Sequence, residues 1–209
     1  RCADDRDGDG WAKRNATLNE IRTDNATADR TGKPTGLPGA SHALHSKREM
    51  NILLCGANGF IGRHLAAALA ARGHRVLRGV HSADGLDDAV AIDYTRDHSP
   101  EIWRPRLEGV DVVINAVGIL REVGGATFGA LHARAAIALF QAASQAGVRR
   151  IVQISALGAD DKAQSRYHRS KKQADDYLAT LPVDWVVVQP SLVYGPDGAS
   201  ARLFETLAS

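Results

Sequence analysis

Apolar and polar positions follow two different patterns along most of this chain: continuous apolar runs, and apolar residues at helical spacing. Short runs that are apolar at nearly every position predict strands buried on both faces, as in a parallel sheet covered by helices on both sides. We predict such strands over residues 51–56, 74–80, 89–94, 110–118, 149–156 and 183–191.

The segments between these strands carry apolar residues at helical spacing. We predict helices over residues 60–72, 99–107, 126–147 and 166–181. Pro105 keeps the second of them short, while Gly73 and Gly147 close the first and the third. Strands and helices in alternation predict right-handed crossovers and a doubly wound parallel sheet, the Rossmann-type α/β architecture with helices on both faces.

Residues 1–49 show neither of these two apolar patterns. Charged and small polar residues dominate there, so this stretch cannot bury enough apolar surface to offset its ordering entropy. We predict a disordered leader over 1–49 and one Rossmann domain over 50–209. Met50 is the only methionine and directly precedes the first strand, so we interpret it as the natural start; a native flexible arm is the alternative. Residues 198–209 form a helical pattern that stops without a cap or a terminating glycine, so we expect the C-terminal substrate region to be truncated.

Composition narrows the functional classes. The formal net charge is +2 and basic residues are scattered among acids, so nucleic acid is not an expected partner. No apolar run approaches the roughly 18 residues of a membrane span. Cys55 lies in an apolar strand and Cys2 in the leader, so we expect a reducing compartment, the cytoplasm, and no disulfide framework. The histidines show no metal spacing, and we expect His64, His74 and His132 at helix surfaces or ends.

Three glycines, Gly56, Gly59 and Gly62, end the first strand with the spacing G-x-x-G-x-x-G. Between a strand and a helix, such a turn is typical of a dinucleotide site. We expect Gly56 to form the tight turn, Gly59 to leave room for the pyrophosphate, and Gly62 to let the helix pack closely. The helix N-terminus would offer N–H groups and partial positive charge to the phosphates. A plain tight turn is the alternative; a Walker loop is excluded because no Gly-Lys-Ser/Thr follows.

The end of the second predicted strand bears on cofactor choice. Sites selective for NAD carry an acid there that binds the ribose 2′-hydroxyl. His81 and Ser82 take that place here, and no acid occurs before Asp84. A histidine and a hydroxyl suit a 2′-phosphate better than a carboxylate would, so the sequence favours NADP over NAD.

The glycine spacing resembles that of the short-chain dehydrogenase/reductase superfamily, and four later stretches agree. AIDY places Asp93 where the family uses an acid to hydrogen-bond the adenine, and NAVG from Asn115 resembles its Asn-Ala-Gly turn under the cofactor. YHRSK supplies the Tyr-x-x-x-Lys pair, and QPSLVYGPDG from Gln189 resembles the segment along the nicotinamide. ISALGAD, SRYHRSK and QPSLVYGP look most like the atypical group related to the NAD(P)-binding accessory subunit of respiratory complex I, which is similar to NAD-dependent epimerases/dehydratases.

The glycine turn, the end of the second strand and the resemblance together predict which residues contact the cofactor. They are Gly56, Asn58, Gly59, Phe60, Ile61, Gly62, His81, Ser82, Asp93, Asn115, Ala116, Val117, Gly118, Tyr167, Lys171, Pro190, Ser191, Leu192 and Val193.

Tyr167 and Lys171 are four residues apart on one predicted helix and therefore share a face. We expect the lysine ammonium to lower the pKa of the tyrosine hydroxyl, which is near 10 in model peptides. Tyr167 could then pass a proton to or from a substrate hydroxyl while hydride moves to or from nicotinamide. Lys171 would also hold the cofactor ribose.

Ser155 decides between two functional hypotheses. Active family members place a serine or threonine shortly after the fifth strand to orient the substrate carbonyl, but Ala156 and Leu157 follow Ser155 here. If Ser155 substitutes for that residue, the chain is an NAD(P)-dependent oxidoreductase or epimerase acting on a small carbonyl or hydroxyl substrate. Otherwise it is a non-catalytic dinucleotide-binding module, such as a redox sensor or a respiratory-complex assembly or accessory subunit.

Overall fold

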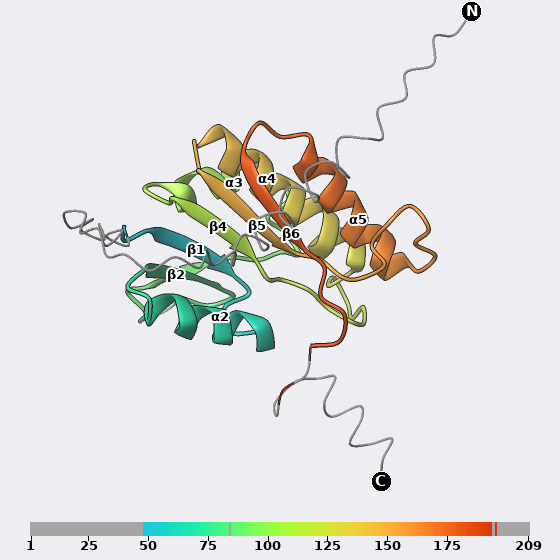
Figure 1. Ribbon diagram of the computed structural model, residues 1–209, viewed down its shortest axis with the longest axis horizontal. Coiled ribbons are helices and arrows are strands. Elements are labelled where there is room, and N and C mark those ends of the chain that lie inside the picture. The colour runs from blue at the N-terminus through green and yellow to red at the C-terminus, as the bar shows by residue number, and fades with distance from the viewer. Residues whose placement is uncertain (1–47, 84, 194, 196–209) are drawn as a thin grey trace, which may run out of the picture. The chain divides into compact units, whose positions relative to one another are not determined.

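A computed structural model describes residues 48–83, 85–193 and 195 (Figure 1). The predicted leader, apart from Arg48 and Glu49, and the helical pattern over 198–209 lie outside these described residues. The strands are β1 Asn51–Cys55, β2 Arg75–Val80, β3 Ala89–Ala91, β4 Val112–Asn115, β5 Arg150–Ile154 and β6 Asp184–Val188. All six form one parallel sheet in the order β3-β2-β1-β4-β5-β6, which confirms the doubly wound prediction.

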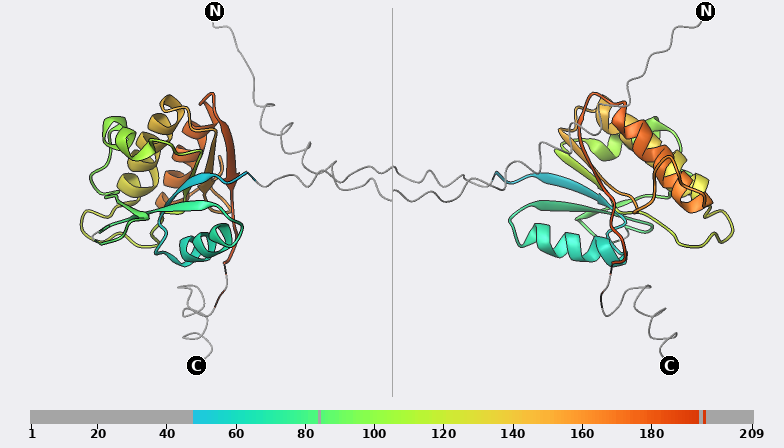
Figure 2. Two further views of the ribbon diagram at one scale, coloured as in Figure 1. Left: turned by 90° about the vertical axis from the view of Figure 1, so that its left-hand side faces the viewer. Right: turned by 45° about the vertical axis from the view of Figure 1, so that its right-hand side comes forward.

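Helices cover the sheet on two sides (Figures 1 and 2). They are α2 Phe60–Ala70, α3 Pro100–Trp103, the 3₁₀-helix η2 Arg104–Leu107, the π-helix η3 Gly129–Arg134, α4 Ala135–Gln145 and α5 Arg166–Ala179. Helix α2 lies on one face, whereas α3, α4 and α5 lie on the other (Figure 2). From β1 the chain first adds β2 and β3 on one side and then crosses over to add β4, β5 and β6 on the other, so the direction of winding changes between β1 and β4. In open parallel sheets, ligands bind at this switch point, beyond the carboxyl ends of the strands.

Strand β1 shows why the apolar runs are continuous. Leu53 and Cys55 pack in the cluster under α3, α4 and α5, whereas Ile52 and Leu54 pack in the cluster under α2. Each of these four side chains is at most 2% exposed. Successive side chains of a strand point to opposite faces, so both faces of this central strand demand apolar residues.

The edge strand β6 departs from the prediction. Its residues alternate between exposed and half-buried, and Val186 and Val188 are each 41% exposed. A continuous apolar run predicts burial on both faces, but β6 is an edge strand whose Trp185 and Val187 pack in the cluster under α3, α4 and α5, while Val186 and Val188 point to the other face. Among the described residues, one of its faces remains accessible to solvent.

The predicted helix over 126–147 is divided in two. Its first part is the π-helix η3, and the α-helix proper begins at Ala135. A π-helical turn is rare and frequently marks a functional site. His132 lies within η3 and is 1% exposed, so the expectation that it lies at a helix surface or end is wrong. The sequence pattern could not show this burial, because it depends on the packing of η3 against other elements.

Within the described part of the chain, no helix is long and apolar enough to cross a membrane. The same residues hold no group of three or more histidine, cysteine, aspartate or glutamate side chains placed to bind a metal ion.

Candidate functional site

The turn after β1 is built on two sterically required glycines. Gly56 has a φ of +79°, and a Cβ there would lie 2.9 Å from the Ala116 carbonyl oxygen. A Cβ on Gly62 would lie 2.0 Å from the Gly56 carbonyl oxygen. Gly56 therefore forms the tight turn and Gly62 allows the close approach of α2, as the sequence predicted. Gly59 has more room, since its Cβ would meet only the Gly56 oxygen at 3.2 Å.

Helix α2 begins beside this turn, and its N-terminus has the features of an anion-binding site. Gly59 is the N-cap residue, no side chain caps this end, and no acidic residue occupies the first turn. The unsatisfied N–H groups and the helix dipole make such an end electropositive. The Arg63 guanidinium lies 5.3 Å from the centre of the Phe60 ring and adds positive charge nearby. This end of α2 is suited to phosphate groups.

A cavity of about 340 Å³ opens beside the glycine turn at the carboxyl ends of β1, β2 and β3. It is lined by Gly56, Asn58, Gly59, Gly79, Val80, His81, Ile92, Asp93, Tyr94, Thr95, Val117 and Leu131. Six of the residues predicted to contact a cofactor are in this lining, although they come from four separate stretches of sequence. The cavity is therefore suited to hold the adenosine half of a dinucleotide.

Asp93 is held as a carboxylate at the wall of this cavity. Its Oδ1 accepts hydrogen bonds from the Thr95 backbone N–H at 2.9 Å and the Thr95 hydroxyl at 2.6 Å. These bonds, together with the charges of His81 and Arg96, lower the pKa of Asp93 below its ordinary value. The carboxylate is thus an acceptor at neutral pH, as hydrogen bonding to an adenine amino group requires.

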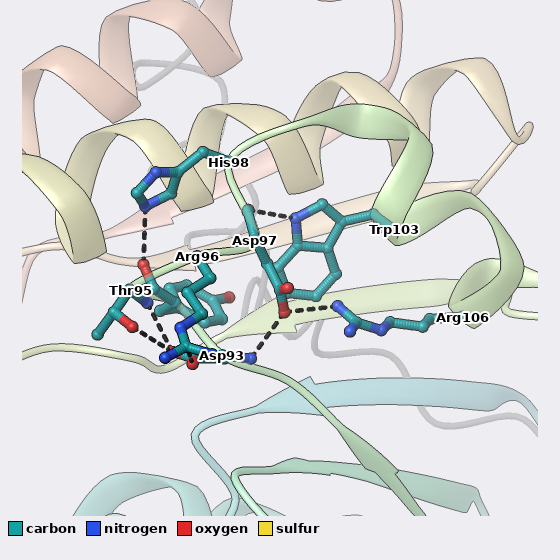
Figure 3. A network of polar contacts seen from close by, with 8 residues as sticks. Asp93, Thr95, Arg96, Asp97, His98, Trp103 and Arg106 are labelled. Carbon is teal, nitrogen blue, oxygen red and sulfur yellow. Dashed lines mark hydrogen bonds and ion pairs between the residues drawn. The ribbon is translucent and has the colours of Figure 1, made fainter.

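A buried ion pair supports the Asp93 turn from behind (Figure 3). The Asp97 carboxylate accepts from the Asp93 backbone N–H at 2.7 Å and from the Arg106 guanidinium at 2.6 Å. The Trp103 indole N–H donates to the Asp97 carbonyl at 2.9 Å. Sequence reasoning missed this support because its members are spread over ten positions with no shared period.

Asn115, at the end of β4, is 1% exposed. Its side-chain oxygen accepts from the Tyr94 hydroxyl at 2.9 Å and from the Val117 N–H at 3.2 Å, and its amide donates to Gln153 Oε1 at 2.8 Å. These bonds are all inside the protein, so the side chain shapes the turn that carries Ala116, Val117 and Gly118. This explains why the predicted strand over 110–118 ends at residue 115.

Lys171 meets this same turn from helix α5. It is 3% exposed, and its ammonium donates to the Val117 carbonyl at 3.2 Å and to the Ile154 carbonyl at 3.0 Å. Burial lowers the pKa of Lys171 to about 8, and the charge of Asp175 partly opposes this change. The lysine thereby joins the turns after β4 and β5 to α5.

Tyr167 is half-buried at the start of α5 among three aromatic rings. Phe128, His132 and His168 meet it edge-on, with ring centres 5.7, 5.3 and 5.1 Å away. Burial raises the pKa of its hydroxyl above the ordinary value of 10.0. The expectation that Lys171 lowers this pKa is therefore wrong, because desolvation by these rings dominates while the Lys171 ammonium donates to backbone carbonyls.

Ser155 lies inside the protein. It is 4% exposed, and its hydroxyl donates to the Asp175 carboxylate. Burial raises the pKa of Asp175 to about 6, an effect larger than the opposing influence of the Ser155 hydrogen bond and the Lys171 charge. This geometry gives Ser155 a buried partner on α5 and argues against its contact with a substrate carbonyl. Asp175 itself was not anticipated from the sequence.

The segment after β6 runs beside the turn after β5. The Pro190 carbonyl accepts from the Leu157 N–H at 3.0 Å, and the Gln189 amide donates to the Ala159 carbonyl at 3.2 Å. Ser191 and Leu192 are exposed at this carboxyl edge of the sheet, between half-buried Pro190 and Val193. His81 and Ser82 are likewise exposed at the end of β2. The predicted site residues therefore follow one edge of the sheet.

Comparisons with known proteins identify the family. The model of the NAD(P)H-binding family matches residues 56–206. The chain belongs to this family. The match includes the glycine turn, the Asp93 turn and the Tyr167–Lys171 helix, so the resemblance drawn from these motifs is confirmed.

Similar proteins include both enzymes and a subunit of a complex. The chain is 30% identical over 162 residues, 75% of its length, to a ceramide reductase from Caulobacter vibrioides. It is 25% identical over 150 residues, 67% of its length, to the rat mitochondrial NADH dehydrogenase [ubiquinone] 1 alpha subcomplex subunit 9. The enzyme WbmH from Bordetella bronchiseptica, solved with NAD⁺, shares the fold with a TM-score of 0.63 and 21% identity; 77% of this chain and 63% of that one are covered.

The chain spans about half the length of the curated relatives that it matches, 51% of the ceramide reductase and 40% of the rat subunit. What it shares with them is the dinucleotide-binding region. The glycine turn, the uncapped start of α2 and the adjacent cavity fit such a cofactor on the geometry of this chain alone.

Proposed function

We propose that this chain is the dinucleotide-binding region of an NADP(H)-dependent reductase that acts on a carbonyl substrate. The observation that carries the proposal is the position of Lys171. Its buried ammonium lies on the turn after β4 and on the same helix face as Tyr167, at the edge of the sheet where the glycine turn also opens. A proton donor and a cofactor site at one edge are what carbonyl reduction needs.

The bound cofactor would supply hydride, and the proton would come from Tyr167. This hydroxyl, whose pKa burial raises above its ordinary value of 10.0, is protonated at neutral pH and can donate to a developing alkoxide, which is the stronger base. The Lys171 ammonium has three donors; carbonyls of the described residues accept from two of them, and we assign the third to a ribose hydroxyl.

We assign Ser155 a positioning role within this mechanism. Its hydroxyl donates to Asp175, which lies one turn after Lys171 on α5, so it fixes this helix against the end of β5. The ceramide reductase of Caulobacter vibrioides and a UDP-2-acetamido-2,6-beta-L-arabino-hexul-4-ose reductase of Pseudomonas aeruginosa, 27% identical, support reduction as the reaction class. An epimerase reaction at the same site is an alternative, and the substrate is a small carbonyl or hydroxyl compound.

The second candidate function is a non-catalytic dinucleotide-binding module. The burial of Ser155 and the Ala156 and Leu157 that follow it favour this alternative, because no serine or threonine then faces the substrate side of the turn. The similarity to the rat NADH dehydrogenase subunit supports it as well. Measured turnover with any carbonyl substrate would decide for the enzyme.

A cytoplasmic location is part of the proposal. Cys55 is a free, fully buried cysteine, and burial raises the pKa of its thiol to about 12. An inert free thiol of this kind is compatible with a reducing compartment and takes no part in the proposed chemistry.

Binding of the dinucleotide tests the proposal directly. We expect Gly59→Val to abolish NADPH binding, because a side chain there would occupy the volume assigned to the pyrophosphate. The fold should survive, since a Cβ at Gly59 meets only the Gly56 oxygen at 3.2 Å. Calorimetric titration measures the affinity, and Ala67→Val, an exposed site on the same helix, is the matched control. Unchanged affinity in Gly59→Val would refute the assignment of this turn.

Cofactor preference should depend on His81. We expect the parent to bind NADPH more tightly than NADH, and His81→Asp to reverse the order by about tenfold or more in relative affinity. The new carboxylate would repel a 2′-phosphate and accept hydrogen bonds from a ribose diol. Titrations with both nucleotides measure the ratio. Equal affinities in the parent that the substitution leaves unchanged would contradict the preference for NADP.

A further inference from the structure

His132 connects two elements of the site through both of its ring nitrogens. Its Nε2 accepts a hydrogen bond from the Ile119 N–H at 3.0 Å, in the segment after β4. Its Nδ1 lies 3.0 Å from the Ser170 hydroxyl oxygen on α5. At 1% exposure the ring has no access to solvent that could replace either bond.

The hydrogen-bond partners fix the tautomer of this ring. The Ser170 hydroxyl donates its single proton to the Tyr167 carbonyl at 2.7 Å, so it must accept from His132 Nδ1–H. The Ile119 N–H requires a lone pair on Nε2. His132 is therefore neutral, with its proton on Nδ1. Burial, aided by the charge of Lys171, lowers its pKa to about 3, in agreement with this assignment.

These contacts flank Lys171 on both sides. Ser170 directly precedes Lys171 on α5. The Val117 carbonyl accepts a hydrogen bond from Lys171, and Ile119 lies two residues after Val117. A Cβ on Gly118 would lie 3.3 Å from Lys171 Nζ and 3.7 Å from His132 Nε2, so the ammonium and the imidazole both lie beside Gly118. The neutral ring can occupy this place beside a cation without repulsion.

We propose that His132 is a positioning residue that holds the turn after β4 against α5 and thereby sets the position of Lys171 and Tyr167 for the nicotinamide half of the cofactor. The inference rests on the proposed function, because it assigns a role to the same site. The cavity assigned to the adenosine half lies mainly at the ends of β1, β2 and β3. Val117 and Leu131 also line it, but neither is a hydrogen-bond partner of His132. Loss of His132 should therefore weaken binding of the nicotinamide half more than binding of the adenosine half.

The test compares a whole cofactor with its adenosine half. His132→Phe keeps an aromatic ring to stack on Phe128 and meet Tyr167, but it removes both hydrogen bonds. We expect NADPH affinity to fall about tenfold, which corresponds to about 1.4 kcal/mol, while 2′,5′-ADP binds within about twofold of the parent. His74→Phe, at the amino end of the sheet before β2, is the matched control and should change neither. Calorimetry measures the affinity of the parent and of each variant for both ligands.

A purely structural role would give a different result. If His132 only stabilised the fold, both ligands would lose affinity together, and that outcome would overturn the proposal, as would unchanged NADPH affinity. A parent that binds neither ligand would refute the proposed function and this inference with it. Nitrogen NMR of the parent tests the geometry without any variant: we expect a neutral Nδ1–H tautomer between pH 5 and 8. A protonated ring in that range would overturn the proposal even if His132→Phe fails to fold.

Discussion

Replacing Gly62 with alanine should destabilise the domain by at least about 3 kcal/mol, at the upper end of what overpacking of an interior costs. The added Cβ would lie 2.0 Å from the Gly56 oxygen, 2.7 Å from the Gly56 carbonyl carbon and 2.9 Å from Ala57 Cα. All three atoms belong to the backbone of the tight turn, so no flexible side chain can move aside. Either α2 moves away from the end of β1 or the turn itself distorts.

Thermal unfolding measures this effect. For a domain of this size, a loss of 3 kcal/mol lowers the Tm by about 6–12 °C. Gly125→Ala is the matched control, because Gly125 has an ordinary φ and no atom would lie within 4 Å of its Cβ. It should melt within about 2 °C of the parent. If Gly62→Ala is as stable as this control, the close packing of α2 on the glycine turn is contradicted.

Replacing Tyr167 with phenylalanine should reduce turnover by about 10²- to 10⁴-fold, the usual contribution of a general acid. This corresponds to about 3–5 kcal/mol of transition-state stabilisation. Phenylalanine keeps the edge-on contacts with Phe128, His132 and His168 and removes only the hydroxyl. Cofactor affinity should therefore stay nearly intact, so that kcat falls while NADPH binding does not.

The measurement follows loss of NADPH absorbance with a panel of ketones and sugar nucleotides. Tyr177→Phe, ten residues further along α5, is the matched control and should turn over at the parent rate. Turnover by Tyr167→Phe at the parent rate would remove this residue from the mechanism. If neither the parent nor any variant turns over a substrate, the result would favour the non-catalytic module instead.

The pH dependence of turnover should report Lys171. Its pKa is lowered to about 8, so its ammonium loses a proton as pH rises through that value. A neutral amine has one proton fewer to donate to the Val117 and Ile154 carbonyls and to the ribose hydroxyl assigned to it, so the site is held less firmly and kcat should fall above about pH 8. Lys171→Arg keeps the charge at all these pH values and should shift this fall to higher pH, although at a lower rate.

The sequence by itself determined the fold class and the location of the cofactor turn. Continuous apolar runs on strands such as β1 require burial on both faces, and their alternation with helices leaves a doubly wound sheet as the solution. Gly56 and Gly62 could be assigned because the constraint on each is local: a positive φ at Gly56, and at Gly62 the close packing of the first turn of α2 on the Gly56 backbone, six residues earlier in the chain. Constraints of this kind involve residues that are close together in the chain, so they can be recognised from the sequence alone.

Only the tertiary structure decided the chemistry at this edge of the sheet. The pKa of Tyr167 is raised because rings from η3 and α5 desolvate it, and the ammonium of Lys171 is directed to carbonyls after β4 and β5. His132 and Asp175 were not expected inside the protein: His132 is the polar residue of a mostly apolar stretch in η3, and Asp175 stands among the many charged residues of α5, so neither is distinguished by its neighbours as buried. Burial and hydrogen bonding depend on segments that are far apart in the chain, such as Val117 and Lys171, which are 54 residues apart. Desolvation is a property of the packed molecule, so no spacing along the chain can express it.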